Sequence, residues 1–366
     1  MLISNNNLLQ YKLNFGKKDN LNKHNIDNYE GCVIGGAIGD ALGNPVEFDR
    51  LSTIKRIYGK NGITDLETVN GKALITDDTQ MTIYTADGLI KSAIKEFDEN
   101  KIPDMKQVYS SYRDWLNTQY GHFSGNEKGW INNIKELYAM RAPGTTCTGS
   151  LRANIPGSIE NHINSSKGCG GVMRVAPAGL MYYKNLKLAF ETGARCAALT
   201  HGSPSAYLPA GVHACIIANL VNGENIEDSV NNSIEVLKTY KGHEDTLELL
   251  EMAKKYAKSD IDSETAIKNL GEGWHGDEAI AISVYCALKS PEDYKNAVIM
   301  AVNHDGDSDS TGAITGNIVG TYLGKKSIPN KWLNTVEIAK ELGMLSQDLY
   351  SKPEDIPNAN KRYFMA

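Results

Sequence analysis

The chain has 366 residues, of which 41% are hydrophobic and 22% charged, and its formal net charge is −6. This length and apolar content suffice for one large core or for two domains. The acidic balance argues against a general nucleic-acid binder, which would carry a basic surface, and it leaves small molecules and proteins as candidate substrates.

Cysteine usage and the apolar runs restrict the class further. The six cysteines are scattered and form no Cys-x-x-Cys pair, so neither structural zinc nor a redox disulfide is expected. The N-terminal residues lack a basic segment followed by an apolar one, which argues against a secretory signal. The longest apolar runs, such as residues 214–221, are far shorter than the roughly 20 residues of a membrane helix. We therefore expect a cytoplasmic protein with no membrane or nucleic-acid partner.

The N-terminal residues differ in composition from the rest of the chain. They are rich in Asn, Lys and Asp, and apolar residues alternate with polar ones from Leu9 to Phe15. This alternation places aromatic and aliphatic side chains on one face of an extended segment, as in peptide-in-groove recognition. A loose tail with incidental apolar residues is the competing interpretation. The predicted organisation is an N-terminal extension or docking arm over residues 1–28, followed by one domain over residues 29–366.

Four glycines recur every four residues from Gly31 to Gly43, and they form one smooth stripe if this segment is helical. Each interior glycine costs about 1 kcal/mol of helix propensity relative to alanine, so the stripe needs the close approach of another helix. A second stripe with the same spacing consists of Gly312, Gly316 and Gly320. We predict that these two helices cross closely in the core.

Apolar spacing predicts helices along most of the chain, and neither long β-branched alternation nor a 20-to-50-residue repeat interrupts them. Ser290 and Pro291 offer an N-cap and a first-turn proline, and Gly271 follows the helical run that ends at Leu270. The predicted fold is therefore all-α, with one large compact helical domain. The further predicted helices cover residues 79–96, 104–118, 130–140, 185–199, 205–221, 226–239, 245–258, 263–270, 277–288 and 291–302.

The segment from Asp305 to Gly312 carries three carboxylates at alternate positions in a turn rich in Gly and Ser. Such a density of like charge is unfavourable unless a cation lies among the oxygens, and hard divalent metals are the usual partners. A calcium loop of the EF-hand type does not fit, because its glycine position holds Ser310 and its closing glutamate position holds Gly316. The other interpretation is a solvated acidic turn that caps a helix.

A second acidic helix start, from Thr76 to Met81, favours the metal interpretation. Each of the two acidic clusters could supply half of a two-metal oxygen cage. Cations near helix N-termini would be repelled by the exposed N–H dipoles unless carboxylates stood between them.

Five motifs resemble the ADP-ribosylglycohydrolase family, and they occur in the family's order. They are Gly39-Asp40-Ala41-Leu42-Gly43 with a following Glu47, Thr76-Asp77-Asp78-Thr79, Gly170-Gly171-Val172-Met173-Arg174-Val175-Ala176-Pro177, Thr200-His201, and Gly306-Asp307-Ser308-Asp309-Ser310-Thr311-Gly312. The resemblance implies an all-helical fold of that type. It also implies two bound magnesium ions, or manganese in their place, and hydrolysis of the bond that joins ADP-ribose to a protein side chain.

The resemblance also implies roles by motif position. Asp309 would bridge both ions, and Glu47 would be a general acid/base or a gate, with a plain surface glutamate as the competing interpretation. Ser310 stands where the family often has threonine, and it keeps the hydroxyl oxygen. The implied metal ligands are Thr76, Asp77, Asp78, Asp307, Asp309 and Ser310, and the implied catalytic residues are Glu47, Asp77, Asp78 and Asp309.

The loop from Ser166 to Gly171 would hold the diphosphate. Its glycines let backbone N–H groups approach oxygen atoms closely, which forms an anion nest without a basic side chain. A simple flexible turn is the competing interpretation. His201 would line the adenosine side, and residues Trp274 to Glu278 would close the far end of the pocket. The implied substrate-binding residues are Ser166, Gly168, Cys169, Gly170, Gly171 and His201.

The expected linkage is to arginine. The Asp-Ser-Asp-Ser-Thr-Gly form of the last motif is more similar to the arginine-specific branch, which includes the dinitrogenase-reductase-activating enzymes, than to the serine-specific branch. Some family members are immunity factors against ADP-ribosylating toxins, so the expected partners are an ADP-ribosylated protein and a transferase bound by the N-terminal arm. The rival class is a binding protein that blocks a transferase with little turnover, and the intact metal-ligating residues argue against it.

Overall fold

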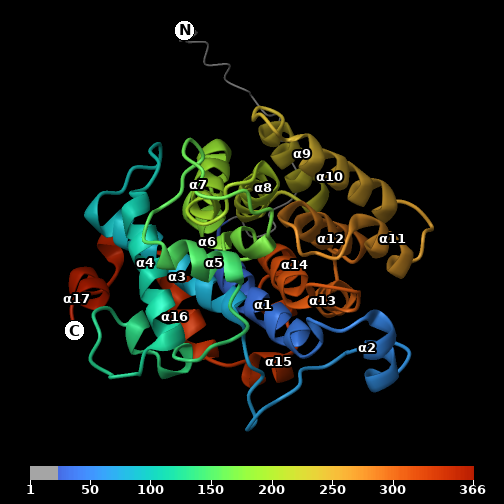
Figure 1. Ribbon diagram of the computed structural model, residues 1–366, viewed down its shortest axis with the longest axis horizontal. Coiled ribbons are helices and arrows are strands. Elements are labelled where there is room, and N and C mark those ends of the chain that lie inside the picture. The colour runs from blue at the N-terminus through green and yellow to red at the C-terminus, as the bar shows by residue number, and fades with distance from the viewer. Residues whose placement is uncertain (1–23) are drawn as a thin grey trace.

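The computed structural model describes residues 24–366 (Figure 1), so the apolar alternation predicted to form a docking arm lies outside the described residues. Within that range every regular element is a helix and no strand is formed, which confirms the predicted all-α fold. The first helix, α1, covers Ile26–Gly43, and its N-cap Asn25 accepts a hydrogen bond from the Asn28 amide. Residues 24–28 therefore belong to the folded body, and not to the extension.

The connections between the α-helices vary in length, and the longest, such as residues 121–144, contain only short 3-10 turns. The α-helices are α1 (Ile26–Gly43), α2 (Leu51–Tyr58), α3 (Asp77–Lys95), α4 (Met105–Tyr120), α5 (Thr145–Arg152), α6 (Ala176–Met181), α7 (Leu186–Ala198), α8 (Pro204–Val221), α9 (Ile226–Leu237), α10 (Glu244–Ala257), α11 (Ser263–Leu270), α12 (Gly276–Lys289), α13 (Tyr294–Val302), α14 (Ser308–Leu323), α15 (Asn330–Thr335), α16 (Ala339–Tyr350) and α17 (Ala359–Phe364). Short 3-10 turns are η1 (Asn44–Val46), η2 (Ile131–Asn133), η3 (Lys135–Leu137), η4 (Cys169–Gly171), η5 (Lys325–Ser327) and η6 (Pro353–Asp355).

Helices α1 and α14 cross at the centre of the molecule, as the two glycine stripes predicted (Figure 1). A Cβ atom added to Gly39 would lie 2.0 Å from the carbonyl oxygen of Gly312, and one added to Gly316 would lie 2.2 Å from that of Gly35. No side chain fits between these backbones. The stripes thus allow direct contact between the helices, and this contact places the first turn of α14 beside the last turn of α1.

The remaining helices surround this central pair. In Figure 1, α4, α16 and α17 lie on one side of it, and α9, α10 and α11 lie on the other. Helix α8 is long and apolar enough to cross a membrane, but 94% of it is buried inside the protein, as expected of a core helix. Its mostly uncharged sequence therefore has a packing explanation.

Two local predictions are wrong. Residues 130–140 form the 3-10 turns η2 and η3 and no α-helix, because Asn132 and Asn133 donate side-chain hydrogen bonds to nearby backbone carbonyls and so compete with helical pairing. Ser290 does not cap α13. It is the C-cap of α12, and the side chain of Asp293 caps α13 by accepting the Asn296 amide at 3.0 Å.

Candidate active site

Two of the central helices begin with acidic residues, and capping chemistry explains why. The N-cap of α3 is Thr76, whose hydroxyl oxygen accepts the Asp78 amide at 3.2 Å. The N-cap of α14 is Asp307, whose carboxylate accepts the Ser310 amide at 3.4 Å. Side-chain oxygens at these positions satisfy unpaired N–H groups, and negative charge suits the positive end of a helix. Both predicted acidic helix starts are therefore formed.

The helix crossing brings Glu47 onto the start of α14. One carboxylate oxygen from each of Glu47, Asp307 and Asp309 lies within 4.8 Å of the others, and all three side chains are buried. Glu47 follows η1, which itself follows α1 directly. A Cβ atom added to Gly43, the last residue of α1, would lie 2.5 Å from the backbone of Asp309. Close packing at the end of α1 thus positions Glu47 in the acidic cluster.

Asp77 and Asp78 are not in this tight group, but their charges act on it. Both are buried, and Asp77 accepts the Gly144 amide at 3.1 Å. Burial, followed by the charge of Asp309, raises the pKa of Asp78 well above its usual range. Burial, followed by the charges of Asp309, Asp307 and Asp77, raises the pKa of Glu47 to about 10. The five carboxylates therefore destabilise one another's charged forms.

The chemistry of this donor set fits a hard cation. No salt bridge among residues 24–366 involves any of the five carboxylates, and Asp78 Oδ2 is buried without a hydrogen-bond partner. An unpaired, desolvated carboxylate oxygen is strongly unfavourable unless a cation binds it. Carboxylate and hydroxyl oxygens are the ligands that magnesium and manganese take in proteins, so the residues present fit a divalent-metal centre.

Asp40 organises the start of α3, a role that the sequence analysis did not assign. Its carboxylate accepts the Thr76 amide at 3.0 Å, the Thr79 amide at 3.1 Å and the Thr79 hydroxyl. Burial, followed by the charge of Asp309, raises the pKa of Asp40 to about 7. The available signal was that Asp40 is the one charged residue between Gly31 and Gly43.

The predicted diphosphate loop has fewer free amides than expected. The Gly168 amide donates to Ser166 Oγ at 3.3 Å, and the Cys169 amide donates to the Trp274 carbonyl at 3.0 Å. Gly168 therefore does not offer its amide to an anion, which corrects the expected nest. Gly170 and Gly171 follow these two amides and lie within the 3-10 turn η4.

The predicted diphosphate loop is in direct contact with the acidic cluster. Cys169 Sγ lies 2.6 Å from Asp307 Oδ2 and 3.7 Å from Ser310 Oγ, and the Ser310 hydroxyl also lies 3.8 Å from Met173 Sδ. Burial raises the pKa of the Cys169 thiol well above its usual range, so the thiol keeps its proton and donates it to the carboxylate. Cys169 therefore lies at the junction of the predicted substrate loop and the predicted metal ligands.

His201 lies beneath the loop and not on its open face. Its side chain is 1% exposed, Nδ1 lies 2.8 Å from Thr200 Oγ1, and its ring would contact a Cβ atom added to Gly170 at 3.2 Å. Burial, followed by the charge of Arg174, lowers the pKa of His201 to about 3, so the ring is neutral. A ligand has almost no surface of His201 to contact, and we replace the expected adenosine contact with a supporting role.

Arg174 supports the same loop from the core. Its guanidinium is fully buried, donates to Thr200 Oγ1 at 2.7 Å and to the Cys196 carbonyl at 3.1 Å, and lies 4.2 Å from the centre of the Tyr112 ring. The motif that contains Arg174 is thus partly a structural one. It fixes the chain that follows Gly170 and Gly171.

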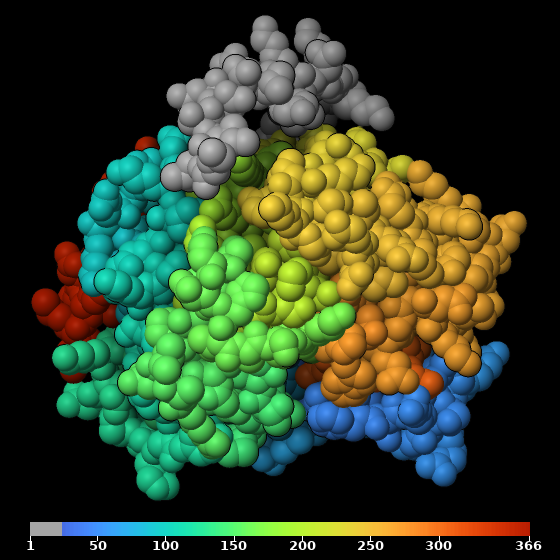
Figure 2. All heavy atoms as spheres, turned by 45° about the horizontal axis from the view of Figure 1, so that its top comes forward, coloured from blue at the N-terminus to red at the C-terminus, as the bar shows by residue number. Residues whose placement is uncertain are grey.

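Residues Trp274 to Glu278, which were expected to close the far end of the pocket, border the loop. Gly168 and His275 form a backbone bridge, and the Glu272 carbonyl accepts the Asp307 amide at 2.8 Å. Figure 2 shows the face on which the green segment around α5, the orange segment before α12 and the blue segment around α2 meet. The candidate site therefore draws on several distant parts of the chain.

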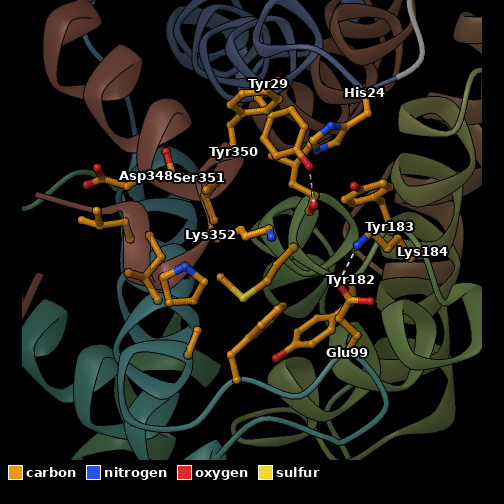
Figure 3. Close-up of a pocket in the computed structure, with 18 of the residues that line it drawn as sticks. His24, Tyr29, Glu99, Tyr182, Tyr183, Lys184, Asp348, Tyr350, Ser351 and Lys352 are labelled. Carbon is orange, nitrogen blue, oxygen red and sulfur yellow. Dashed lines mark hydrogen bonds and ion pairs between the residues drawn. The ribbon is translucent and has the colours of Figure 1, made fainter.

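A separate cavity of about 120 Å³ lies away from the acidic cluster (Figure 3). The ring of His24 stacks there on Tyr183 at 4.4 Å and on Tyr350 at 4.8 Å. Tyr29, near the start of α1, also lines it, whereas Glu47 follows the other end of this 18-residue helix. At about 1.5 Å per residue the two ends are roughly 27 Å apart. The cavity is therefore no part of the acidic cluster.

The fold and the site define a helical protein built around a buried cluster of carboxylates, with a glycine-containing loop beside it. A model of the ADP-ribosylglycohydrolase family matches residues 21–358, and this chain belongs to that family. Proteins of this family are generally dimetal-dependent hydrolases, which agrees with the acidic cluster.

Named relatives cover most of the chain. An uncharacterized protein of Archaeoglobus fulgidus is 28% identical over 88% of this chain and 96% of its own length. The ADP-ribosylhydrolase ARH3 of Mus musculus is 23% identical (89% and 91%), and the ADP-ribosylarginine hydrolase Tri1 of Pseudomonas putida is 23% identical (90% and 80%). A solved structure titled "ADP-ribosylglycohydrolase-related protein complex" has a TM-score of 0.55 at 23% identity and covers 89% of this chain and 97% of its own, which supports the fold.

Proposed function

We propose that this protein removes ADP-ribose from modified arginine side chains of other proteins, with two magnesium ions held between the starts of α3 and α14. The observation that carries this proposal is the convergence of Glu47, Asp307 and Asp309 in one buried cluster. Cys169 of the predicted diphosphate loop contacts Asp307 of that cluster, so a diphosphate held by the loop would be adjacent to the carboxylates. Manganese would satisfy the same oxygen donors.

Each residue then has a role in a hydrolysis of the N-glycosidic bond. When bound, the ions would supply Lewis-acid chemistry and orient the ribose hydroxyls and a water molecule. The water oxygen bonds to the anomeric carbon, the bond from that carbon to the guanidinium nitrogen breaks, and arginine leaves. Glu47 would take the water proton and return it to the leaving group. The proposed metal ligands are Thr76, Asp77, Asp78, Asp307, Asp309 and Ser310.

Two observations support arginine as the acceptor. The last motif reads Asp-Ser-Asp-Ser-Thr-Gly, the form that resembles the arginine-specific branch, and the similar Tri1 proteins carry the name ADP-ribosylarginine hydrolase. ARH3 proteins are equally similar at 23% identity, so identity alone does not choose the acceptor. The choice therefore needs a direct assay.

The test is release of ADP-ribose from a protein modified on arginine, compared with one modified on serine, with and without magnesium. We expect faster release from the arginine substrate, loss of activity with a chelator, and no turnover in Asp77→Asn or Asp309→Asn variants that keep the helical circular-dichroism spectrum. Faster release from serine would overturn the arginine assignment. Near-normal activity in either variant would overturn the two-cluster site.

We further propose that the protein acts in the cytoplasm and reverses the action of an ADP-ribosyltransferase, as an immunity factor does. The N-terminal arm predicted to bind that transferase lies outside the described residues. A chain that begins at His24 keeps Asn25, the N-cap of α1. We expect the shortened chain to keep its hydrolase rate and to lose affinity for the transferase, measured by calorimetry. Equal affinity with and without these residues would refute the docking arm.

A further inference from the structure

Two aromatic side chains lie exposed beside the acidic cluster, and nothing in the catalytic arrangement above uses them. Phe48 is 75% exposed and Trp274 is 37% exposed, although both belong to residue types that proteins normally bury. Their rings stack on each other, with centroids 5.9 Å apart and planes 18° from parallel. An exposed aromatic pair at the rim of a site indicates a ligand-contacting surface.

The backbones that carry the two rings are fixed on both sides. The Trp274 carbonyl accepts the Cys169 amide at 3.0 Å, so Trp274 is tied to the substrate loop. Phe48 follows Glu47 directly, and the Leu51 amide after it donates to Asp305 Oδ1 at 2.6 Å. The rings therefore join the substrate loop to the residue proposed to move the proton. A group held between them would lie at the reacting end of the substrate.

The charge around the pair favours a cation. The neighbouring cluster contains the buried carboxylates of Glu47, Asp77, Asp78, Asp307 and Asp309, and Asp40 is buried beside Asp309, so two divalent ions, with four positive charges, would leave the region net negative. The nearby cationic side chain of Arg50 already contacts Glu272 at 2.9 Å and Asp305 at 3.4 Å. A positively charged leaving group would thus gain both from the aromatic faces and from the residual negative charge.

We propose that Phe48 and Trp274 clamp the guanidinium group of the ADP-ribosylated arginine and so determine which acceptor is released. The guanidinium is planar, always charged and weakly hydrated, and it stacks on aromatic faces more readily than an ammonium does. Two van der Waals layers of about 3.5 Å require roughly 7 Å between the ring planes, so the rings, whose centroids are 5.9 Å apart, need to separate by at least about 1 Å. An exposed Phe48 side chain can make that movement.

This clamp rests on the proposed arginine specificity and deepens it. A serine acceptor offers a neutral hydroxyl, which gains nothing from an aromatic face. The pair would therefore act on the arginine substrate alone and leave the recognition of the shared ADP-ribose unchanged. A purely structural pair, which only holds Glu47 in place, would instead affect both substrates equally.

The experiment compares Phe48→Ala and Trp274→Ala with the wild type on arginine-linked and serine-linked ADP-ribose, with agmatine as a guanidinium probe. Phe97→Ala is the matched control, because Phe97 is also 37% exposed and lines the remote cavity. We expect KM for the arginine substrate to rise roughly 3- to 30-fold, the range of one cation–π contact, and the arginine-to-serine ratio of kcat/KM to fall by a similar factor. Inhibition by agmatine should weaken by the same factor.

Conservative variants distinguish the contribution of the aromatic ring face from that of side-chain volume. Trp274→Phe should keep most of the arginine preference, whereas Phe48→Leu should lose it. An equal fall of kcat on both substrates, or an unchanged arginine-to-serine ratio in a wild-type-like background, would overturn the clamp and leave the proposed function standing. A wild type that does not act on arginine-linked ADP-ribose at all would overturn the proposed function, and the clamp with it.

Discussion

The central helix pair behaves differently along its length. In its middle, α1 and α14 meet through glycine faces, with no charged side chain between the backbones of Gly39 and Gly312. At its end, one turn further on, Glu47, Asp307 and Asp309 crowd three carboxylates into a buried space. The neutral contact is rigid because no side chain can rotate there. We infer that this rigid contact holds the charged end in place against its own repulsion.

The contact in the middle should be the least tolerant part of the molecule. Gly39→Ala places a methyl group 2.0 Å from the Gly312 carbonyl oxygen, so both backbones must separate. We expect the free energy of unfolding to fall by at least about 3 kcal/mol, as measured by urea denaturation. The control is Gly149→Ala on α5, where no atom lies within 4 Å of the added methyl group and a small gain in stability is expected. Equal effects of the two substitutions would contradict the rigid contact.

The next largest effect is expected for a substitution of Asp40, at the charged end of the helix pair. Asp40→Asn weakens the acceptor that holds the Thr76 and Thr79 amides at the start of α3. Because Asp40 orients proposed ligands without binding the cation, we expect magnesium affinity to fall about 10- to 100-fold, measured by calorimetry, with the fold retained. Asp114→Asn, in a half-buried pair with Lys91 away from the cluster, is the control. Unchanged magnesium affinity in Asp40→Asn would show that Asp40 does not position the proposed ligands.

Without metal, the charged end should be a source of instability. Asp78→Asn removes one charge from the cluster, and its Oδ2 atom has no hydrogen-bond partner to lose. We expect the metal-free variant to be more stable than the metal-free wild type by roughly 1 to 2 kcal/mol, and magnesium to raise its Tm much less. A metal-free variant that is less stable than the wild type would show that the carboxylate has an internal partner.

The neutral interior and the charged end also differed in how well the sequence predicted them. The glycine spacing of Gly31 to Gly43 was enough to predict the α1–α14 contact, because a stripe without side chains has one structural use. The acidic helix starts at Asp77 and Asp307 followed from capping and charge. Both patterns are local, so a single sequence contains them completely.

Features that depend on distant contacts were not predictable in the same way. The amide of Gly168 is used by Ser166 Oγ, and the burial of His201 depends on how the loop folds over it. The stacking of Phe48 on Trp274 joins residues 226 positions apart, which no periodicity shows. Helices α2, α5, α6, α15, α16 and α17 were also missed. All of these except α16 are too brief to develop a full amphipathic pattern.

The smallest expected effect concerns the protonation of a histidine buried in the interior. His213 is fully buried, its ring pairs with the Val172 carbonyl through Nδ1 at 3.0 Å, and burial lowers its pKa to about 4. Between the usual pKa of about 6.5 and 4 the unfolded chain binds a proton that the folded chain does not, so stability falls as pH falls. As the pH falls through that window, the free energy of unfolding should decrease by about 1.4 kcal/mol less per pH unit in His213→Asn than in the wild type.

Urea unfolding of both proteins at pH 7.5 and pH 5 measures this difference. Because other groups titrate equally in the two chains, the comparison isolates His213. A parallel loss of stability in wild type and variant would mean that the site admits a proton, and the contrast between a neutral interior and a charged end would weaken.

The central claim is that the carboxylates of α3 and α14 form one divalent-cation centre. Equilibrium dialysis against manganese, with the bound metal counted per chain, tests it most directly. We predict two ions per wild-type chain, displaced by magnesium, and fewer than two in both Asp77→Asn and Asp309→Asn. Absence of specific binding in the wild type, or an unchanged count in both variants, would contradict the claim.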